Sequence, residues 1–96
     1  MRAILHVDIV TLARCLLMVE ADKRALLCDK VFMHAHTGDK YRKRFERIHH
    51  TFGSGSLVSA CGDLPRKPEP FLSNKEYAHC LRVVFNRILS PEVGLS

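Results

Sequence analysis

Five basic side chains in one short stretch, KYRKRFER at positions 40–47, are the residues best suited to bind an anion. They are Lys40, Arg42, Lys43, Arg44 and Arg47. With Glu46 as the one acid among them, five positive charges and one negative give the stretch +4, against +5 for the whole chain. Since so localised a surplus creates a strong local potential, it predicts an anionic partner.

On a helix, these residues would form a basic ridge. Positions 40, 43, 44 and 47 recur at spacings of three and four and share one face, whereas Arg42 projects to a flank. Tyr41, Phe45 and Ile48 lie roughly opposite, so we expect them to face the core. Against phosphates, such a ridge gains mostly from counterion release, which salt weakens. An acidic protein partner, or a solvated face that only keeps the protein soluble, are the other interpretations.

The polar residues after the basic stretch form a second candidate site. HHTFGSGS, at 49–56, is predicted to be a loop in which Gly53 and Gly55 supply flexible backbone. Free N–H groups before a short helix over 57–61 favour an anion. The residues of this candidate anion site are His49, His50, Ser54 and Ser56. A P-loop lysine and a preceding strand are missing, so the other interpretation is a loop in which Ser54 or Ser56 caps the helix.

The remaining polar residues give little support for metal binding, cofactor binding or catalysis. His34 and His36 are two positions apart, so on a helix they diverge, and no histidines and cysteines follow the spacing of zinc sites. Carboxylates do not cluster in pairs suited to acid–base catalysis. We therefore predict no metal, no cofactor and no enzymatic activity. A small ligand or enzyme site around His49, His50 and the glycine loop is a further alternative.

The four cysteines stand far apart, and none forms a C-x-x-C pair: Cys15, Cys28, Cys61 and Cys80. Three of them lie among Leu, Ala and Val at helical spacing, where a free thiol behaves as a small hydrophobe. The start, MRAILHVDIV, lacks the apolar core and the cleavage site of a signal peptide. We therefore predict buried, reduced cysteines in a reducing compartment, with disulfides or metal ligation as the alternative.

Size and composition predict a single globular domain over residues 1–96, with 47% apolar residues. No apolar run approaches the roughly 20 residues that span a bilayer, so we expect a soluble, cytoplasmic protein without membrane contact. Because surface dominates so small a domain, burial in a homodimer would add stability.

Apolar periodicity predicts two helices in the first half of the chain. The first covers 9–19, with Asp8 before it able to cap a free N–H. The second, capped by Asp22, covers 23–36 and then meets Gly38. Either it continues to about position 48 or a separate basic helix follows the glycine. We favour one long or kinked helix, because an apolar row continues beyond Gly38.

The second half begins with the short helix and continues with GDLPRKPEPF at 62–71, whose three prolines predict an extended connector. Ser73 and Glu76 then fit the S-x-x-E capping box of a last helix that ends at Ser90. Arg87 lies off its apolar stripe, which consists of Tyr77, Leu81, Val84, Phe85 and Ile88. The predicted fold is an all-α bundle of about four helices with a Gly/Ser loop and a Pro-rich connector.

Three phrases of the chain resemble a group of short, uncharacterised bacterial proteins: MRAILHVDIV, DKYRKRFERIHHTFGSGSL and KPEPFLSNKEYAHCL. The resemblance covers nearly the whole chain. Its most specific part is Tyr41-Arg42-Lys43 followed by His49 and by Gly-x-Gly-Ser-Leu at 53–57. No activity is assigned to that group, so the resemblance implies no function. It does imply that the basic stretch and the glycine loop belong to one unit.

These patterns predict a small interaction or adaptor protein whose basic ridge binds an acidic or phosphate-bearing partner. The main alternative is nucleic-acid binding through the same residues. It would not be sequence-specific, because the chain shows no motif for reading bases.

Overall fold

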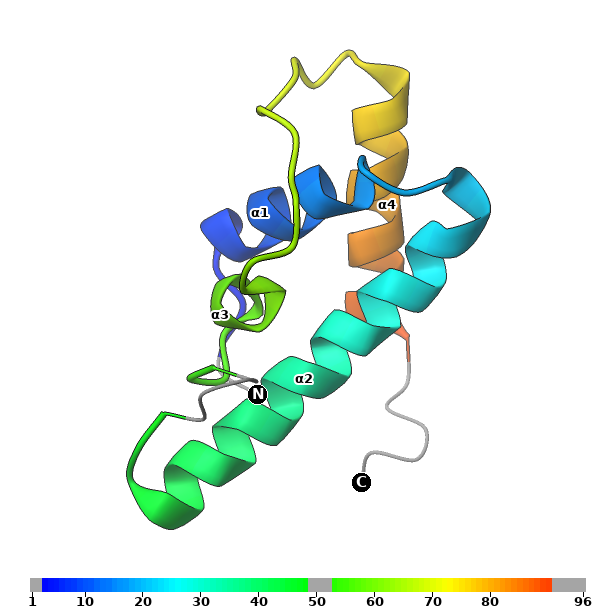
Figure 1. Cartoon of the computed structure of the whole chain (residues 1–96). Coiled ribbons are helices and arrows are strands. Elements are labelled where there is room, and N and C mark those ends of the chain that lie inside the picture. The colour runs from blue at the N-terminus through cyan, green and yellow to red at the C-terminus, as the bar shows by residue number, and fades with distance from the viewer. Residues whose placement is uncertain (1–2, 49–52, 91–96) are drawn as a thin grey trace.

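The structure is a computed structural model that describes residues 3–48 and 53–90. Across these ranges the chain forms four α-helices and one 3-10 turn, with no strand, which confirms the predicted all-α fold (Figure 1). The elements are α1 (His6–Leu16), η1 (Ala21–Lys23), α2 (Arg24–Phe45), α3 (Leu57–Cys61) and α4 (Lys75–Leu89). None of the described helices is both long enough and apolar enough to cross a membrane.

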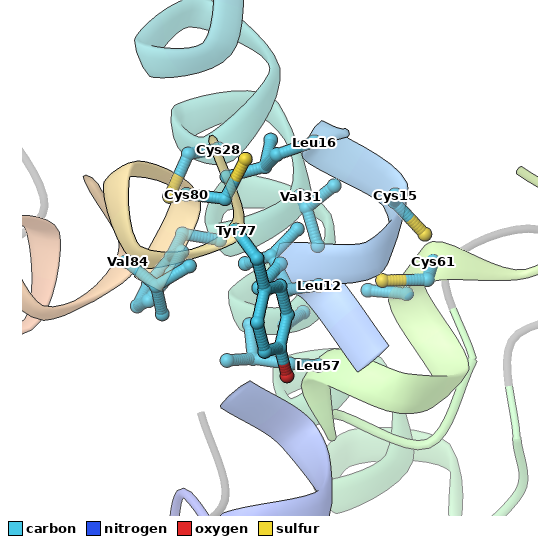
Figure 2. Packing of buried hydrophobic residues seen from close by; sticks show 14 residues of the cluster. Leu12, Cys15, Leu16, Cys28, Val31, Leu57, Cys61, Tyr77, Cys80 and Val84 are labelled. Carbon is cyan, nitrogen blue, oxygen red and sulfur yellow. The ribbon is translucent and has the colours of Figure 1, made fainter. Parts of the chain in front are cut away.

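One apolar core holds the helices together, because α1 and α2 each pack against both α3 and α4. Leu12 and Leu16 of α1, Leu57 of α3 and Tyr77 of α4 are fully buried at its centre (Figure 2). Burying one side chain of this size stabilises the fold by about 1.5–3 kcal/mol. All four cysteines are also buried in this cluster, and none is bridged, so their predicted place in the core is confirmed.

The first helix is bounded by contacts to distant parts of the chain. Asp8 does not precede α1 but lies in its first turn, where its carboxylate accepts the N–H of Leu5 at 2.8 Å and of Val58 at 3.0 Å. At the other end, the buried Arg24 donates to the carbonyl oxygen of Leu16 at 3.2 Å. Because that carbonyl has a partner outside the helix, α1 ends at Leu16 and not near Val19 as predicted.

The second helix runs without a break through the buried Gly38, which confirms the single long helix. Its N-cap is Lys23, with no side-chain hydrogen bond, so the predicted Asp22 cap is wrong. The helix ends at Phe45 because Glu46 adopts a left-handed conformation with φ 55°. The C-terminal end of α2, green in Figure 1, extends beyond the helices packed against it.

Because the end of α2 extends beyond its packing partners, the predicted orientation of the basic ridge is wrong. Phe45 and Ile48 were expected to face the core, but 49% and 65% of their surfaces are exposed. The last buried apolar residue of α2 is Ala35, and the core does not reach the helix end. Arg47 lies beyond the helix, so it does not continue the helical row of basic residues.

The last helix begins one residue later than its capping box would place it. Asn74 is the N-cap, and its side-chain oxygen accepts the N–H of Tyr77 at 3.0 Å. The predicted Ser73 cap is therefore wrong. Glu76, the other residue of the predicted capping box, binds Arg24 with its carboxylate at 2.8 Å instead. The buried face of α4 consists of Tyr77, Cys80 and Val84, whereas Phe85 and Ile88 are exposed.

The predicted connector over 62–71 has no helix or strand, and the irregular segment continues to residue 74. It is held against α1 by two hydrogen bonds: Arg14 Nε donates to the carbonyl of Lys67 at 2.6 Å, and the N–H of Lys67 donates to the carbonyl of Arg14 at 3.3 Å. Contacts of this kind allow a segment without regular secondary structure to keep a defined path.

Candidate functional site

A buried carboxylate, Asp39, lies beneath the basic stretch and changes its charge balance. One of its oxygens accepts Arg42 Nη2 at 2.8 Å, and the other accepts Lys43 Nζ at 3.1 Å. Burial raises the pKa of Asp39, but hydrogen bonds and nearby positive charges, those of Arg42 and Lys43 among them, lower it more, so its pKa is well below the ordinary value. Two of the five predicted anion-binding residues are therefore paired within the protein itself.

Arg42 also ties α2 to the glycine loop. Its Nε donates to the carbonyl oxygen of Ser54 at 3.1 Å. Gly55 then lies directly on the helix: its φ is +106°, and a Cβ built there would be 2.7 Å from the Cβ of Asp39. A side chain at this position has neither the space nor the backbone conformation it needs. The basic stretch and the glycine loop therefore form one unit, as the resemblance implied.

The other basic residues remain on the surface at the end of α2. Lys40, Arg44 and Arg47 are exposed and make no ion pair with any carboxylate in the described ranges. The Arg44 guanidinium lies over the Phe45 ring, 5.5 Å from its centre, and Ile48 follows. We call these five residues, Lys40, Arg44, Phe45, Arg47 and Ile48, the α2 tip. It combines three cations with two exposed apolar side chains.

The two serines of the predicted anion site, Ser54 and Ser56, are both hydrogen-bonded to Ser59. Ser56 caps α3, because its Oγ accepts the N–H of Ser59 at 3.1 Å, which confirms one of the two predicted caps. The backbone N–H of Ser54 donates to Ser59 Oγ at 3.1 Å, and the two hydroxyls are 3.3 Å apart. These contacts support the interpretation of the loop as a helix cap. His49 and His50 lie outside the described residues.

Ser59 organises this loop, and the sequence analysis missed it. Its hydroxyl also donates to the carbonyl oxygen of Ser56 at 3.0 Å. The S-x-x-S spacing of Ser56 and Ser59 was the available signal, because a capping serine commonly meets the residue three positions later. Asp39 was missed as well, although it stands three and four positions before Arg42 and Lys43, the spacing of ion pairs on a helix.

A second polar cluster joins three helices behind the N-terminus of α2. Arg24 is buried and donates to Leu16 of α1, while its Nη1 contacts the Glu76 carboxylate at 2.8 Å and His79 Nδ1 at 2.9 Å. The Arg24 guanidinium lowers the pKa of the exposed Glu76 carboxyl. Arg24 thus contacts residues of α1 and α4 from the first position of α2, so the cluster joins these three helices.

The chemistry of a metal centre is not assembled in the part of the chain that the structure describes. No three His, Cys, Asp or Glu side chains converge there as ligands.

A cavity of about 240 Å³ lies between α2 and α4 and is lined by Cys28, Asp29 and Arg87, among others. Asp29 and Arg87 form an ion pair across it, at 3.0 Å. Arg87 also lies 4.8 Å over the Phe32 ring, so it packs against α2 and is not a solvated residue.

Residues 2–88 match the model of a protein family described as a domain of unknown function, DUF7742. The match covers α1 to α3 and α4 up to its last residue but one, including the basic stretch and the glycine loop. It confirms the resemblance to a group without an assigned activity. No curated protein and no solved structure matches the chain.

Proposed function

The chain belongs to this family of unknown function, and we propose that it is a small interaction protein that binds an acidic protein partner through the α2 tip. One observation carries the proposal. Three cations that make no ion pair with a described carboxylate, Lys40, Arg44 and Arg47, lie beside two exposed apolar side chains at the projecting end of α2. Arginine and aromatic side chains are enriched at protein interfaces, where they account for much of the binding free energy.

The apolar part of the tip favours a protein over a polyanion. Phosphate groups would use only the cations and would leave Phe45 and Ile48 in water. A protein surface with an apolar patch and a carboxylate rim would cover both and gain about 25 cal/mol for each Å² of apolar area buried. Charges at the rim would mainly speed association and select the partner.

The tip is also held in place before any partner binds. Asp39 and Arg42 fix the last turns of α2 to the glycine loop, and Val31, Phe32 and Ala35 anchor the middle of the helix in the core. A surface that is already ordered loses less conformational entropy on binding than a flexible segment does.

One feature of the tip supports nucleic-acid binding as the second candidate. The rings of Tyr41 and Phe45 lie 4.7 Å apart and are tilted by 47°, next to the Arg44 guanidinium. Bases of a single strand stack on such aromatic and guanidinium surfaces while cations follow the phosphates. This alternative differs from the first in its steep dependence on salt.

Fluorescence anisotropy with two labelled probes separates these functions. One probe is an acidic amphipathic peptide with leucines at helical spacing, and the other is single-stranded DNA of similar charge. We expect the peptide to bind more tightly, and the double variant Arg44→Glu/Arg47→Glu to weaken this binding at least 10-fold, since each reversed contact costs about 1 kcal/mol or more. Phe45→Ala should weaken binding of the peptide but not of a leucine-free acidic peptide.

The matched control is Lys30→Glu/Arg82→Glu, which makes the same charge change at exposed positions of α2 and α4 away from the tip. It should bind within about 2-fold of the wild type. Equal losses in both double variants would show that only net charge matters and would refute a site at the tip. Tighter binding of DNA, with a steep salt slope, would establish the nucleic-acid alternative instead.

A further inference from the structure

Two cysteines that are far apart in the chain lie side by side in the fold. Cys15 on α1 and Cys61 at the end of α3 are at one edge of the core, and their side chains lie next to one another (Figure 2). Both side chains are buried where α1 packs against α3.

Cys15 can nevertheless be reached by a small molecule. It lines a cavity of about 190 Å³ together with Met18, Val19, Leu27, Leu64 and Pro65. Since a water molecule occupies about 30 Å³ of liquid volume, this cavity has room for hydrogen peroxide. Its apolar walls favour such a small neutral oxidant over a bulky, charged disulfide such as oxidised glutathione.

Two guanidinium groups near the pair are held in place by backbone carbonyls. Arg66 Nη2 donates to Gly62 at 2.7 Å, directly after Cys61, and Arg14 Nε donates to the connector. Hydrogen bonding with the neighbouring Cys61 thiol lowers the pKa of Cys15 below that of an ordinary thiol, against the effect of burial and with help from Arg66 and Arg14. This environment favours the thiolate of Cys15, which is the reactive form.

Cys28 combines a neighbouring cavity with an environment that favours the thiol. It also lines a cavity, of about 240 Å³, between α2 and α4. Its neighbour is the Asp29 carboxylate, and burial together with this negative charge raises the pKa of Cys28 to about 12. Cys28 is thus a thiol at neutral pH and serves as an internal comparison for Cys15.

We propose that Cys15 and Cys61 form a peroxide-sensitive dithiol, a modification site at which hydrogen peroxide converts two thiols into an intramolecular disulfide. The Cys15 thiolate attacks one peroxide oxygen, the O–O bond breaks, and the departing hydroxide takes up a proton to form water. Cys15 is then a sulfenic acid. Cys61, on losing its proton, attacks the Cys15 sulfur, and the S–O oxygen leaves as the second water. Two thiols are oxidised and one peroxide is reduced.

Peptide mapping tests this site directly, because trypsin places the four cysteines in four different peptides. Cys15 falls in 15–23, Cys61 in 48–66, Cys28 in 25–30 and Cys80 in 76–82. The folded wild-type protein is treated with stoichiometric hydrogen peroxide, alkylated and digested without reductant. We expect the peptide pair 15–23/48–66 to appear first, with the loss of two hydrogens from the intact mass. The pair should disappear on reduction.

Three variants and a pH profile test the assigned roles. In Cys61→Ser, we expect Cys15 to stay a sulfenic acid that dimedone labels, whereas Cys28→Ser should still form the disulfide. Between pH 7 and pH 5 the rate should fall at least about 10-fold, because protonation of Cys15 removes the attacking thiolate. Arg66→Gln should shift this profile to higher pH, since it removes a positioning charge and leaves both thiols in place.

Three results would overturn the proposal. The first is no linkage of 15–23 to 48–66 in the folded protein under peroxide that oxidises a free thiol control. The second is linkage that appears only when urea is added, which would place the reaction in the unfolded chain. The third is earlier linkage of 25–30 to 76–82, which would show that the Cys15 environment gives no advantage. Because mapping uses the wild-type protein, the result does not depend on the folding of a variant.

Discussion

Replacing Asp39 with asparagine should lower the free energy of unfolding by about 2–3 kcal/mol at pH 7. The carboxylate is 2% exposed and accepts hydrogen bonds from Arg42 at 2.8 Å and Lys43 at 3.1 Å. Asparagine has nearly the same shape, so the change removes the charge and one acceptor while leaving the packing intact. Urea unfolding followed by circular dichroism measures the difference.

The magnitude follows from the two contacts at this carboxylate and from the amide that replaces it. Without the charge, the bond to Arg42 loses about half of the roughly 1.5–3 kcal/mol of a charge-assisted bond. The Lys43 side chain is 69% exposed, so its pair contributes about 0.2–1 kcal/mol. The amide N–H₂ of the variant would be buried against a cation without an acceptor, at a cost of about 1 kcal/mol.

The effect should depend on pH in a defined direction. The folded-state pKa of Asp39 is below its unfolded-state pKa, because hydrogen bonds and positive charges around the carboxylate, including those of Arg42 and Lys43, outweigh burial. The stabilisation is therefore complete above the unfolded-state pKa of about 4 and is lost as pH falls through the folded-state pKa. The gap between wild type and Asp39→Asn should be widest between about pH 5 and pH 7 and should narrow as the pH falls below about 4.

The control is Asp22→Asn, at an exposed position that makes no ion pair with a described residue. It should remain within about 0.5 kcal/mol of the wild type. If Asp39→Asn also stays within that range at pH 7, the carboxylate is not an anchor of α2. A large difference in the free energy of unfolding that does not change with pH would also contradict the prediction, since it would show that the shape of the side chain, and not its charge, is responsible.

Two further pairs of substitutions test the loop and the last helix by thermal or urea unfolding. Gly55→Ala should lower the free energy of unfolding by about 3 kcal/mol or more, because its φ is +106° and the new Cβ would lie 2.7 Å from a carbon of α2. Gly62→Ala should cost only its backbone strain, about 1–3 kcal/mol, because its φ is +52° but no atom lies nearer than 3.9 Å. Asn74→Ala should lower the free energy of unfolding by about 1 kcal/mol, because it removes the N-cap of α4. Ser73→Ala should lower it by under about 0.5 kcal/mol. A larger loss for Ser73→Ala than for Asn74→Ala would show that Ser73, as the capping box predicts, is the cap.

Much of the fold could be predicted because its helices follow local rules. The apolar row that continues past Gly38 correctly predicted one helix, since a glycine costs only about 1 kcal/mol in a helix with long flanks. Ser56 was correctly named as one of two caps, because capping depends on the next three residues. Local periodicity also placed the cysteines in the core.

The errors arise where a distant residue competes for a local partner. Glu76 fits a capping box, but Arg24 takes its carboxylate, and Asn74 becomes the cap. Phe45 continues an apolar row, yet a chain of 96 residues builds no core that far along α2. Periodicity shows which face of a helix is apolar, but it does not show how far along the helix a partner exists to cover that face.

The candidate sites were predictable to a similar degree. The basic stretch was found from composition, but its ridge was overestimated, because Asp39 neutralises part of it from within the same helix. That pairing was visible in the sequence. The pairing of Cys15 with Cys61 was not, since the two thiols meet only through the packing of α1 against α3, and no local spacing records it.

The five residues of α3 are far too few to form a helix alone, since isolated helices of under about 12–15 residues are marginal in water. The helix therefore exists because of contacts made elsewhere: Asp8 of α1 accepts the N–H of Val58 across 50 positions, and Leu57 is buried in the core. Arg42 holds the preceding loop across 12 positions. Buried polar contacts, and not helix propensity, thus decide where the glycine loop lies, and through Arg42 they also fix the end of α2 on which the proposed binding surface stands.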